Sequence, residues 1–378
     1  MPAGETMFRA LAVAALAALA ACVGGCGESD SDDAGVDASA TPVDGELSVL
    51  TYNVAALPQG LSQSEPERNL PLISPLLNTY DLVLVQEDFV YHDLLSAAAE
   101  HPHRSETSGL GDCSTVCDQP ESSASLGDGL NRFSRFAFAP LWRRAWERCN
   151  GLLDAGSDCL TPKGVSVAHT QLATGAVVDV YNLHMDASGG DADVRAEQVT
   201  QLLSLIEERS SGRAIILGGD TNMRRDEPGL QALLDGAGLR DACREVDCGD
   251  ERIDRVMLRD GDGVELTVRG WRVADEFKHD EGGRLSDHRA VHVDIAFSAD
   301  GAGMLDPEAD PSPAPEPEPV DIPSDERCPS EEVFRFRAAG CCVANTCGVA
   351  DPLITGTCLP REAFPSQYAE LDALACDR

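Results

Sequence analysis

The chain is 378 residues long, 43% hydrophobic and acidic, with 29 Lys and Arg against 65 Asp and Glu and a formal net charge of −36. The hydrophobic content is sufficient for a buried core and excludes a wholly disordered chain. The shortage of basic residues excludes a protein that binds polyanions through a broad basic surface, because such binding depends on clustered Lys and Arg.

The N-terminus has the pattern of an export signal. A short Ala- and Leu-rich run follows Arg9 and ends in a segment that resembles a bacterial lipobox, LAAC, at Cys22. We therefore expect 1–22 to be a lipoprotein signal peptide, with Cys22 lipidated and the protein anchored to the bacterial outer membrane or cell surface. The alternatives are lipidation at Cys26, an ordinary cleaved signal with secretion, and a start at Met7. The 14 cysteines also favour an oxidising compartment.

Two low-complexity segments divide the rest of the chain. Residues 23–45 are rich in Gly, Ser, Asp and Ala and predict a disordered tether. Residues 299–327 are expected to be a linker, because 306–325 alternate Pro with acidic residues, which is typical of an extended spacer.

The C-terminal residues 328–378 form a Cys-rich segment that is too short to bury much core. We expect a disulfide-rich module here, and the sequence does not choose the pairing. Its six cysteines are Cys328, Cys341, Cys342, Cys347, Cys358 and Cys376. A zinc knuckle is less favoured, because the segment has no His and no CxxC pair.

Residues 46–298 remain as one large domain. Five apolar runs in it have the length and composition of buried strands: 47–52, 82–86, 177–183, 214–217 and 290–295. Between them, Val194 to Arg209 places its apolar residues on one helical face, and a second helix begins near Leu230. Strands interleaved with helices indicate a layered α/β domain.

Carboxylate, carboxamide and imidazole side chains lie at the ends of these runs. They are Asn53, Glu87, His184, Asp220 with Asn222, and Asp287 with His288. Carboxylate and amide oxygens are suitable ligands for a hard cation such as Mg²⁺, and histidines beside such a cation are suitable for proton transfer. A divalent cation would also supply the positive charge that the chain lacks for phosphate chemistry.

Taken in order, seven segments resemble the endonuclease/exonuclease/phosphatase superfamily, which has the deoxyribonuclease-I-like fold. They are LTYNVAALP (50–58), DLVLVQEDF (81–89), GDGLNRFSRFAF (127–138), YNLHMDA (181–187), ILGGDTNM (216–223), IDRVM (253–257) and LSDHRAV (285–291). The resemblance covers essentially all of 46–298. It implies a four-layered α/β sandwich, two packed β-sheets flanked by helices, with the site at one rim.

The resemblance also implies a metal site for Mg²⁺ or Mn²⁺. Asn53, Glu87 and Asp287 match metal-site positions of the family. Asp220 and Asn222, in the GDxN motif, match the pair that contacts the metal and the scissile phosphate.

The remaining matched residues are implied to move protons. His288 matches the general base, and Asp254 matches the carboxylate that orients it. His184 matches the histidine that binds the phosphate and protonates the leaving oxygen, and Asp186 is a weaker match.

Within the superfamily, some segments resemble the bacterial sphingomyelinase-like branch: Cys149-Asn150-Gly151, residues 158–165, Val194-Arg195 and Gln198. We therefore expect a metal-dependent, sphingomyelinase-like phospholipid phosphodiesterase. The segment 273–285 lacks the aromatic hairpin of membrane-acting members, because Phe277 is its sole aromatic residue. The alternatives are an exported DNase-like endonuclease and a catalytically inactive binding lipoprotein at the cell surface. Residues 46–298 hold 42 acidic and 23 basic residues, which disfavours the nuclease.

An arginine cluster over 132–148 is compatible with a nucleic-acid groove or with a solvated helix face. Trp142 and Trp146 lie within this cluster, four positions apart, and we expect them either to pack in the core or to form a small patch on a helix.

Six cysteines of the large domain form close pairs flanked by turn-type residues. We expect three local disulfides that fix surface loops: Cys113–Cys117, Cys149–Cys159 and Cys243–Cys248. The expected partners are a phosphodiester substrate and, through the N-terminal lipid, a membrane. We expect the protein to be a monomer.

Overall fold

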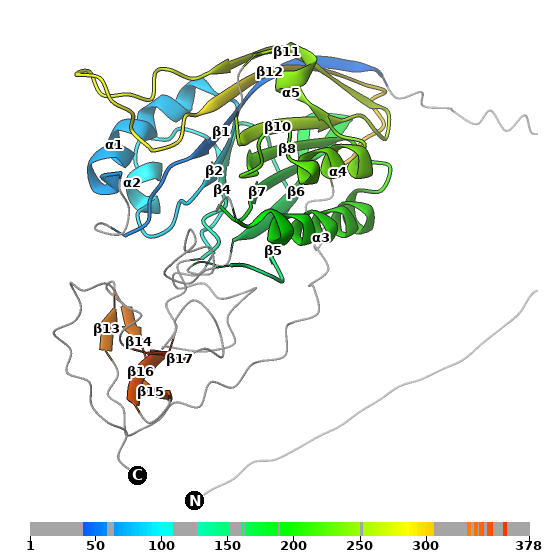
Figure 1. Ribbon diagram of the computed structural model, residues 1–378. Coiled ribbons are helices and arrows are strands. Elements are labelled where there is room, and N and C mark those ends of the chain that lie inside the picture. Colours follow the sequence, from blue (N-terminus) through cyan, green and yellow to red (C-terminus); the bar gives the residue numbers. More distant parts are fainter. Residues whose placement is uncertain are drawn as a thin grey trace, which may run out of the picture. The chain divides into compact units, whose positions relative to one another are not determined.

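The computed structural model describes residues 41–58, 64–108, 127–150, 161, 163–187, 190–249 and 252–305, together with the backbone of short strands between 331 and 360 (Figure 1). The expected signal peptide with Cys22 and most of both tethers lie outside the described residues. Among the described residues, no helix combines the length and the apolar composition needed to cross a membrane.

Two six-stranded sheets form the large domain. The first has the strand order β11 (Val264–Val273), β12 (Val291–Ala299), β1 (Val43–Asn53), β2 (Leu82–Gln86), β4 (Asn131–Ser134) and β3 (His103–Arg104). The second has the order β5 (Trp142–Ala145), β6 (Gly164–Ala173), β7 (Ala176–His184), β8 (Ile215–Asp220), β10 (Asp254–Arg259) and β9 (Arg240–Asp241). All five strands expected from the apolar runs are present.

The two sheets pack face to face through one apolar core. Val49 and Leu84 of the first sheet meet Val180 and Ile216 of the second in this core, and all four are buried. Gly218 of β8 marks a close approach, since a Cβ atom there would lie 2.6 Å from Leu84 Cδ1. A larger residue at this position would push the sheets apart.

Helices cover the outer faces of both sheets. On the first sheet lie α1 (Pro66–Leu76), the 3₁₀ turn Leu77–Thr79 and α2 (His92–Ser96), and on the second lie α3 (Ala192–Ser210) and α4 (Pro228–Ala237), with the short α5 (Ala242–Glu245) following β9 (Figure 1). Val199 and Leu202 of α3 pack on Leu217 of β8, as the apolar face of this helix predicts. The layers are therefore helix, sheet, sheet, helix, which confirms the predicted four-layered α/β sandwich.

Strand direction brings the polar strand ends to one rim. β1 is parallel to β2 and β7 is parallel to β8, so Asn53 lies opposite Gln86 and His184 lies opposite Asp220. β10 runs antiparallel to β8 and begins where β8 ends, which sets Asp254 opposite Asp220.

The tryptophan and arginine cluster is not helical. Trp142 and Trp146 lie in and directly after β5 and are 5% and 8% exposed, so the prediction of core packing is confirmed. Arg209 stacks on the Trp142 ring, with its guanidinium carbon 3.8 Å from the ring centroid. Arg132 is buried and Arg143 pairs with a carboxylate of the loop before β4, so these two line neither an open groove nor a solvated helix face.

The structure tests the disulfide expectations in part. Cys243 and Cys248 form the expected disulfide, and Cys149 is disulfide-bonded. Cys113, Cys117 and Cys159 lie outside the described residues.

In the Cys-rich module the structure describes backbone strands alone. They are β13 (Glu331–Val333) paired with β14 (Phe336–Ala338), and a sheet of β15 (Gly340–Val343), β16 (Thr346–Ala350) and β17 (Cys358–Pro360). The expected disulfides of this module stay a prediction.

Replacing both Cys243 and Cys248 with Ser is expected to lower the free energy of unfolding by about 2 kcal/mol, because the bond closes a short loop in the unfolded chain. Urea unfolding of the double variant measures the loss. The turnover of the variant should equal that of the unchanged protein, since the bond fixes the end of α5, a helix that contributes no side chain to the group of site residues described below. A loss of turnover at unchanged stability would contradict this assignment.

Candidate active site

The rim where β1, β2, β7 and β8 end carries a dense group of polar side chains. Its members are Asn53 of β1, Glu87 after β2, His184 of β7, Asp220 of β8, Asp254 of β10 and His288 before β12. Asn53, His184, Asp220 and Asp254 are each at most 3% exposed. Buried ionisable groups at this density are typical of functional sites.

Asn53 joins two of the carboxylates. Its side-chain Nδ2 donates to Glu87 Oε1 at 2.9 Å and to Asp220 Oδ2 at 3.2 Å, and its Oδ1 accepts from the backbone N–H of Ala55 at 3.0 Å. The amide nitrogen therefore faces both acids, and Asn53 holds the two carboxylates at a fixed separation.

Glu87 has a strained backbone. Its φ of 56° lies in the left-handed region, which costs a non-glycine residue on the order of 1–3 kcal/mol. Gly129, in the loop before β4, packs against it, and a Cβ atom there would lie 3.0 Å from Glu87 Cα. The Gly129 loop therefore keeps this conformation in place and directs the carboxylate into the site.

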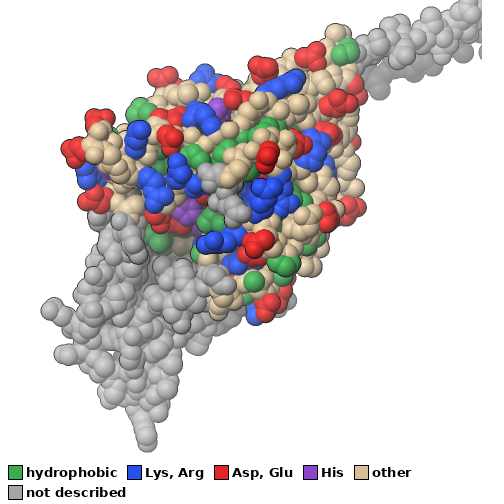
Figure 2. Space-filling model, turned by 45° about the horizontal axis from the view of Figure 1, so that its top comes forward, with side chains coloured by type: hydrophobic (Ala, Val, Ile, Leu, Met, Phe, Trp, Pro, Cys, Tyr) green, Lys and Arg blue, Asp and Glu red, His purple; other side chains and the backbone are tan. Residues whose placement is uncertain are grey.

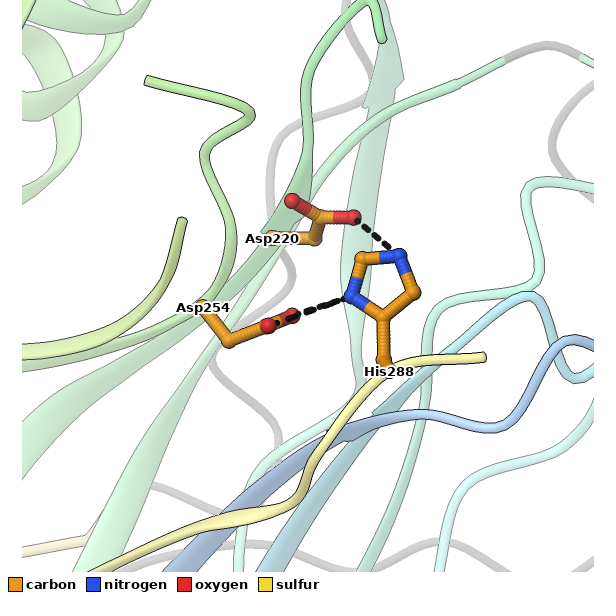
Figure 3. A group of neighbouring side chains, drawn as sticks. All are labelled: Asp220, Asp254 and His288. Carbon is orange, nitrogen blue, oxygen red and sulfur yellow. Dashed lines mark hydrogen bonds and ion pairs between the residues drawn. The ribbon is translucent and has the colours of Figure 1, made fainter. Parts of the chain in front are cut away.

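His288 lies between two carboxylates (Figure 3). Its Nδ1 is 2.9 Å and 3.1 Å from the two oxygens of Asp254, and its Nε2 is 3.6 Å from Asp220 Oδ2. The assigned pairing of Nδ1 with Asp254 makes Nδ1 the protonated nitrogen of the neutral ring and leaves Nε2 as its proton acceptor.

Ser286 fixes the loop that carries His288. Its hydroxyl donates to the backbone carbonyl of Asn53 at 2.7 Å and accepts from the backbone N–H of His288 at 3.1 Å. Ser286 stands in the LSDHRAV motif and was not among the predicted site residues. A Ser hydroxyl that bonds the backbone two residues on is a known turn motif, and this signal could have identified it.

His184 lies deeper in the same site. Its Nε2 is 3.5 Å from Asp220 Oδ2 and 3.9 Å from Glu87 Oε1. Burial, with added repulsion from Lys163 and His288, lowers the pKa of His184 well below its usual range, so the ring is neutral at pH 7.

Three further predicted residues surround this group. Asn222 has a φ of 50°, donates from Nδ2 to the backbone carbonyl of Met185 at 2.8 Å, and donates from its backbone N–H to Asp220 Oδ1 at 3.0 Å. Asp287 is exposed next to His288. The buried Asp186 accepts from Gln198 Nε2 at 2.7 Å, so its carboxylate holds the loop after β7.

Trp146, a core residue directly after β5, also supports the site. Its indole Nε1 donates to the backbone carbonyl of His184 at 2.6 Å, and its backbone N–H donates to the carbonyl of Lys163 at 2.9 Å. The core packing of Trp146 was foreseeable, but nothing in the sequence pattern indicates this contact.

Comparison with known proteins gives relatives that are named for the cleavage of sphingolipids. No protein-family model matches the sequence. The chain is 32% identical over 291 residues to a sphingomyelinase of Mycobacterium tuberculosis, covering 70% of this chain and 56% of the relative. It is 29% identical over 192 residues to an inositol phosphosphingolipids phospholipase C of Schizosaccharomyces pombe, covering 47% of this chain and 42% of the relative. The chain thus spans about half the length of the curated relatives it matches.

Solved structures share the fold. Sphingomyelinase C from Streptomyces griseocarneus has 20% sequence identity and a TM-score of 0.51, covering 66% of this chain and 99% of that chain. TDP2 from D. rerio, solved with a single-strand DNA product, has 16% identity and a TM-score of 0.50, covering 66% of this chain and 98% of that chain.

The chain is therefore similar in sequence to sphingomyelinases and shares the fold of sphingomyelinase C. The fold class expected from the seven motifs is confirmed, and the sphingomyelinase relatives support the expected resemblance to the sphingomyelinase-like branch.

The side chains at the rim fit a divalent cation. Ligand atoms of Asp220, Asp254 and His288 lie within 4.8 Å of one another, and Glu87 adds a carboxylate that Asn53 ties to Asp220. Burial raises the pKa of Asp220, and Asp254 raises it further by like-charge repulsion. Burial alone would lower the pKa of His288, but the charges of Asp220 and Asp254 outweigh it and raise this pKa to about 10. These shifts indicate an excess of negative charge that a cation would neutralise.

Replacing Trp146 with Phe is expected to lower kcat by about 10-fold, because the ring still fills the core while the donor to the His184 carbonyl is lost. Steady-state kinetics on a soluble phosphodiester measures the loss. Trp142→Phe is the matched control, since Trp142 packs under Arg209. Equal kcat losses in the two variants, following equal losses of stability, would refute a positioning role for Trp146.

Proposed function

We propose that the protein is an exported metal-dependent phosphodiesterase that hydrolyses a sphingomyelin-type phospholipid, with Mg²⁺ or Mn²⁺ at the rim and a lipid on Cys22 as its membrane anchor. The observation that carries the proposal is the position of His288, with Nδ1 bonded to Asp254 and Nε2 directed to the buried Asp220. This arrangement is suited to removing a proton from water beside a bound phosphate.

The chain's own residues have distinct tasks in this reaction. Glu87 and Asp220, linked by Asn53, would hold the cation, which when bound supplies positive charge to the phosphate oxygens. Asp254 fixes the proton of His288 on Nδ1, so that Nε2 accepts the proton of the attacking water.

His184 and Asn222 act on the phosphate side of the site. His184 is neutral and buried, so its N–H donates a hydrogen bond to a phosphate oxygen and then to the leaving oxygen. Asn222 lies at the same rim, held by its contacts with Asp220 and Met185, and its amide is a neutral donor to phosphate.

The segment 273–285, before His288, is relevant to how the protein would contact a lipid bilayer. Phe277 is buried, with its ring centroid 4.8 Å from that of Tyr52 and 6.2 Å from that of Tyr80. The side chains that the segment 273–285 exposes are charged: Asp275, Lys278, Asp280, Glu281 and Arg284. On the face in Figure 2, hydrophobic side chains are scattered among charged and polar ones. These features support a role for the N-terminal lipid, rather than inserted aromatic side chains, in keeping the enzyme at its substrate.

A substrate panel tests the proposal. Sphingomyelin vesicles, lysophospholipid, a phosphoinositide, plasmid DNA and a bis-aryl phosphodiester are each incubated with Mg²⁺ or with EDTA, beside the His184→Ala variant. We expect Mg²⁺-dependent cleavage of sphingomyelin and loss of that cleavage in the variant. Cleavage of DNA alone would favour the endonuclease, and no cleavage of any substrate would favour an inactive binding lipoprotein.

A further inference from the structure

Arg132 is a charged residue in the apolar layer between the two sheets. It lies in β4 opposite Leu84 of β2 and is 1% exposed. Its Nη2 donates to the backbone carbonyl of Val180, in β7 of the other sheet, at 3.1 Å. The guanidinium therefore lies between the sheets, beside the core that Leu84 and Val180 share.

The charge of Arg132 has no counterion among the described residues. Its Nε and Nη1 make no hydrogen bond there, and the charged neighbour that acts on it is Arg143, another cation. The ring of Phe138, 5.6 Å away, compensates the charge in part. Burial lowers the pKa of Arg132 to about 9, so the group is still protonated at pH 7. An unpaired buried ion costs several kcal/mol, so a charge-compensating partner for Arg132 would stabilise the fold.

A second unpaired donor faces the same layer. Asn182 of β7, two residues from Val180, donates from Nδ2 to the carbonyls of Val85 and Asn131 at 2.9 Å and 3.1 Å, so its side chain points between the sheets. Ser166 of β6 is the cross-strand partner of Asn182 and therefore shares that face. The Ser166 hydroxyl is buried and has no partner among the described residues.

We propose that a small monovalent anion of the size of chloride binds between the sheets beside Arg132, where it accepts from Nε, Nη1 and the Ser166 hydroxyl. Internal water would satisfy the three donors, but it would leave the charge uncompensated. The site is enclosed by both sheets, so the anion binds the folded chain alone and stabilises it by mass action.

Urea unfolding at constant ionic strength tests the proposal, with chloride replaced stepwise by gluconate. For one site, the folding equilibrium constant of the unchanged protein should rise in proportion to chloride once chloride exceeds its dissociation constant, up to tenfold for each tenfold increase. Arg132→Met should remove this dependence. Arg135→Met is the matched control and should keep it, because Arg135 lies next to the end of β4, half-exposed, and donates to the Asn78 carbonyl. A chloride-independent stability of the unchanged protein, or an equal dependence in Arg132→Met, would overturn the proposal.

A direct observation keeps the proposal testable if Arg132→Met does not fold. Crystals of the unchanged protein grown in bromide should give an anomalous peak within hydrogen-bond distance of Arg132 Nε or Nη1. Water molecules or a carboxylate of the chain in that position would refute an anion site. Gln86 is a contrasting case, because its Oε1 has no partner among the described residues and is an acceptor, so a water and not an anion is expected beside it.

Discussion

Replacing His288 with Ala is expected to lower kcat by about 10²- to 10⁴-fold, which is the usual contribution of a positioned general base. The reason is geometric, because Nε2 of His288 is the proton acceptor that Asp254 leaves free at the rim. Steady-state kinetics on a bis-aryl phosphodiester and on sphingomyelin vesicles gives the loss for a soluble and a membrane substrate.

His169→Ala is the matched control for this prediction. His169 also bonds a buried carboxylate through Nδ1, that of Asp179, but this pair lies near the opposite end of β7 from His184. The control should keep kcat within about twofold, even if it lowers stability. Wild-type turnover in His288→Ala, or an equal loss of turnover in His169→Ala, would contradict the assignment of His288 as the general base.

The variant Asp254→Asn distinguishes an electrostatic effect of Asp254 on His288 from a purely structural role of Asp254. The carboxylate of Asp254 is among the charges that raise the pKa of His288 against the effect of burial. Its neutralisation lowers that pKa, and a base works above its pKa, so the acidic limb of the pH profile of kcat/KM should move to lower pH. A purely structural loss would lower the rate without moving the limb.

The central strands were predictable and the edge strands were not, for a physical reason. β2, β7 and β8 are buried along their whole length, so their sequences are mainly apolar. β11, at the edge of the first sheet, alternates buried and more exposed residues and carries several charges, so it shows no such run. The predicted helix α3 was accurate to within two residues because it has a single apolar face.

The residue types of the site were predictable from their places at strand ends, whereas their orientations were not. The sequence cannot show that the amide nitrogen of Asn53, rather than its oxygen, faces Glu87 and Asp220. The contact of Ser286 with Asn53 joins residues 233 positions apart, and that of Trp146 with His184 joins residues 38 positions apart. Such contacts depend on how the two sheets pack, which local patterns do not encode.

Removing divalent cations with EDTA is expected to abolish turnover, and adding Mg²⁺ or Mn²⁺ is expected to restore it. Without a cation, the charges of Asp220 and Asp254 prevail over burial and keep the pKa of His288 at about 10. The base is then protonated at pH 7 and cannot accept a proton from water. The metal-free protein therefore lacks both the charge that binds phosphate and a competent base.

Glu87→Gln should weaken Mg²⁺ binding by about 10- to 100-fold, by analogy with the loss of groups that support metal ligands, and should raise the Mg²⁺ concentration for half-maximal turnover by the same factor. The substitution keeps the shape of the side chain and an oxygen for Asn53 Nδ2, so what changes is the charge. Titration calorimetry and Mg²⁺-dependent kinetics measure the two quantities independently. Glu65→Gln is the matched control, because Glu65 is exposed and pairs with Arg68 on the surface. Full turnover in EDTA, or unchanged Mg²⁺ affinity in Glu87→Gln, would show that the carboxylates at this rim do not hold a catalytic cation.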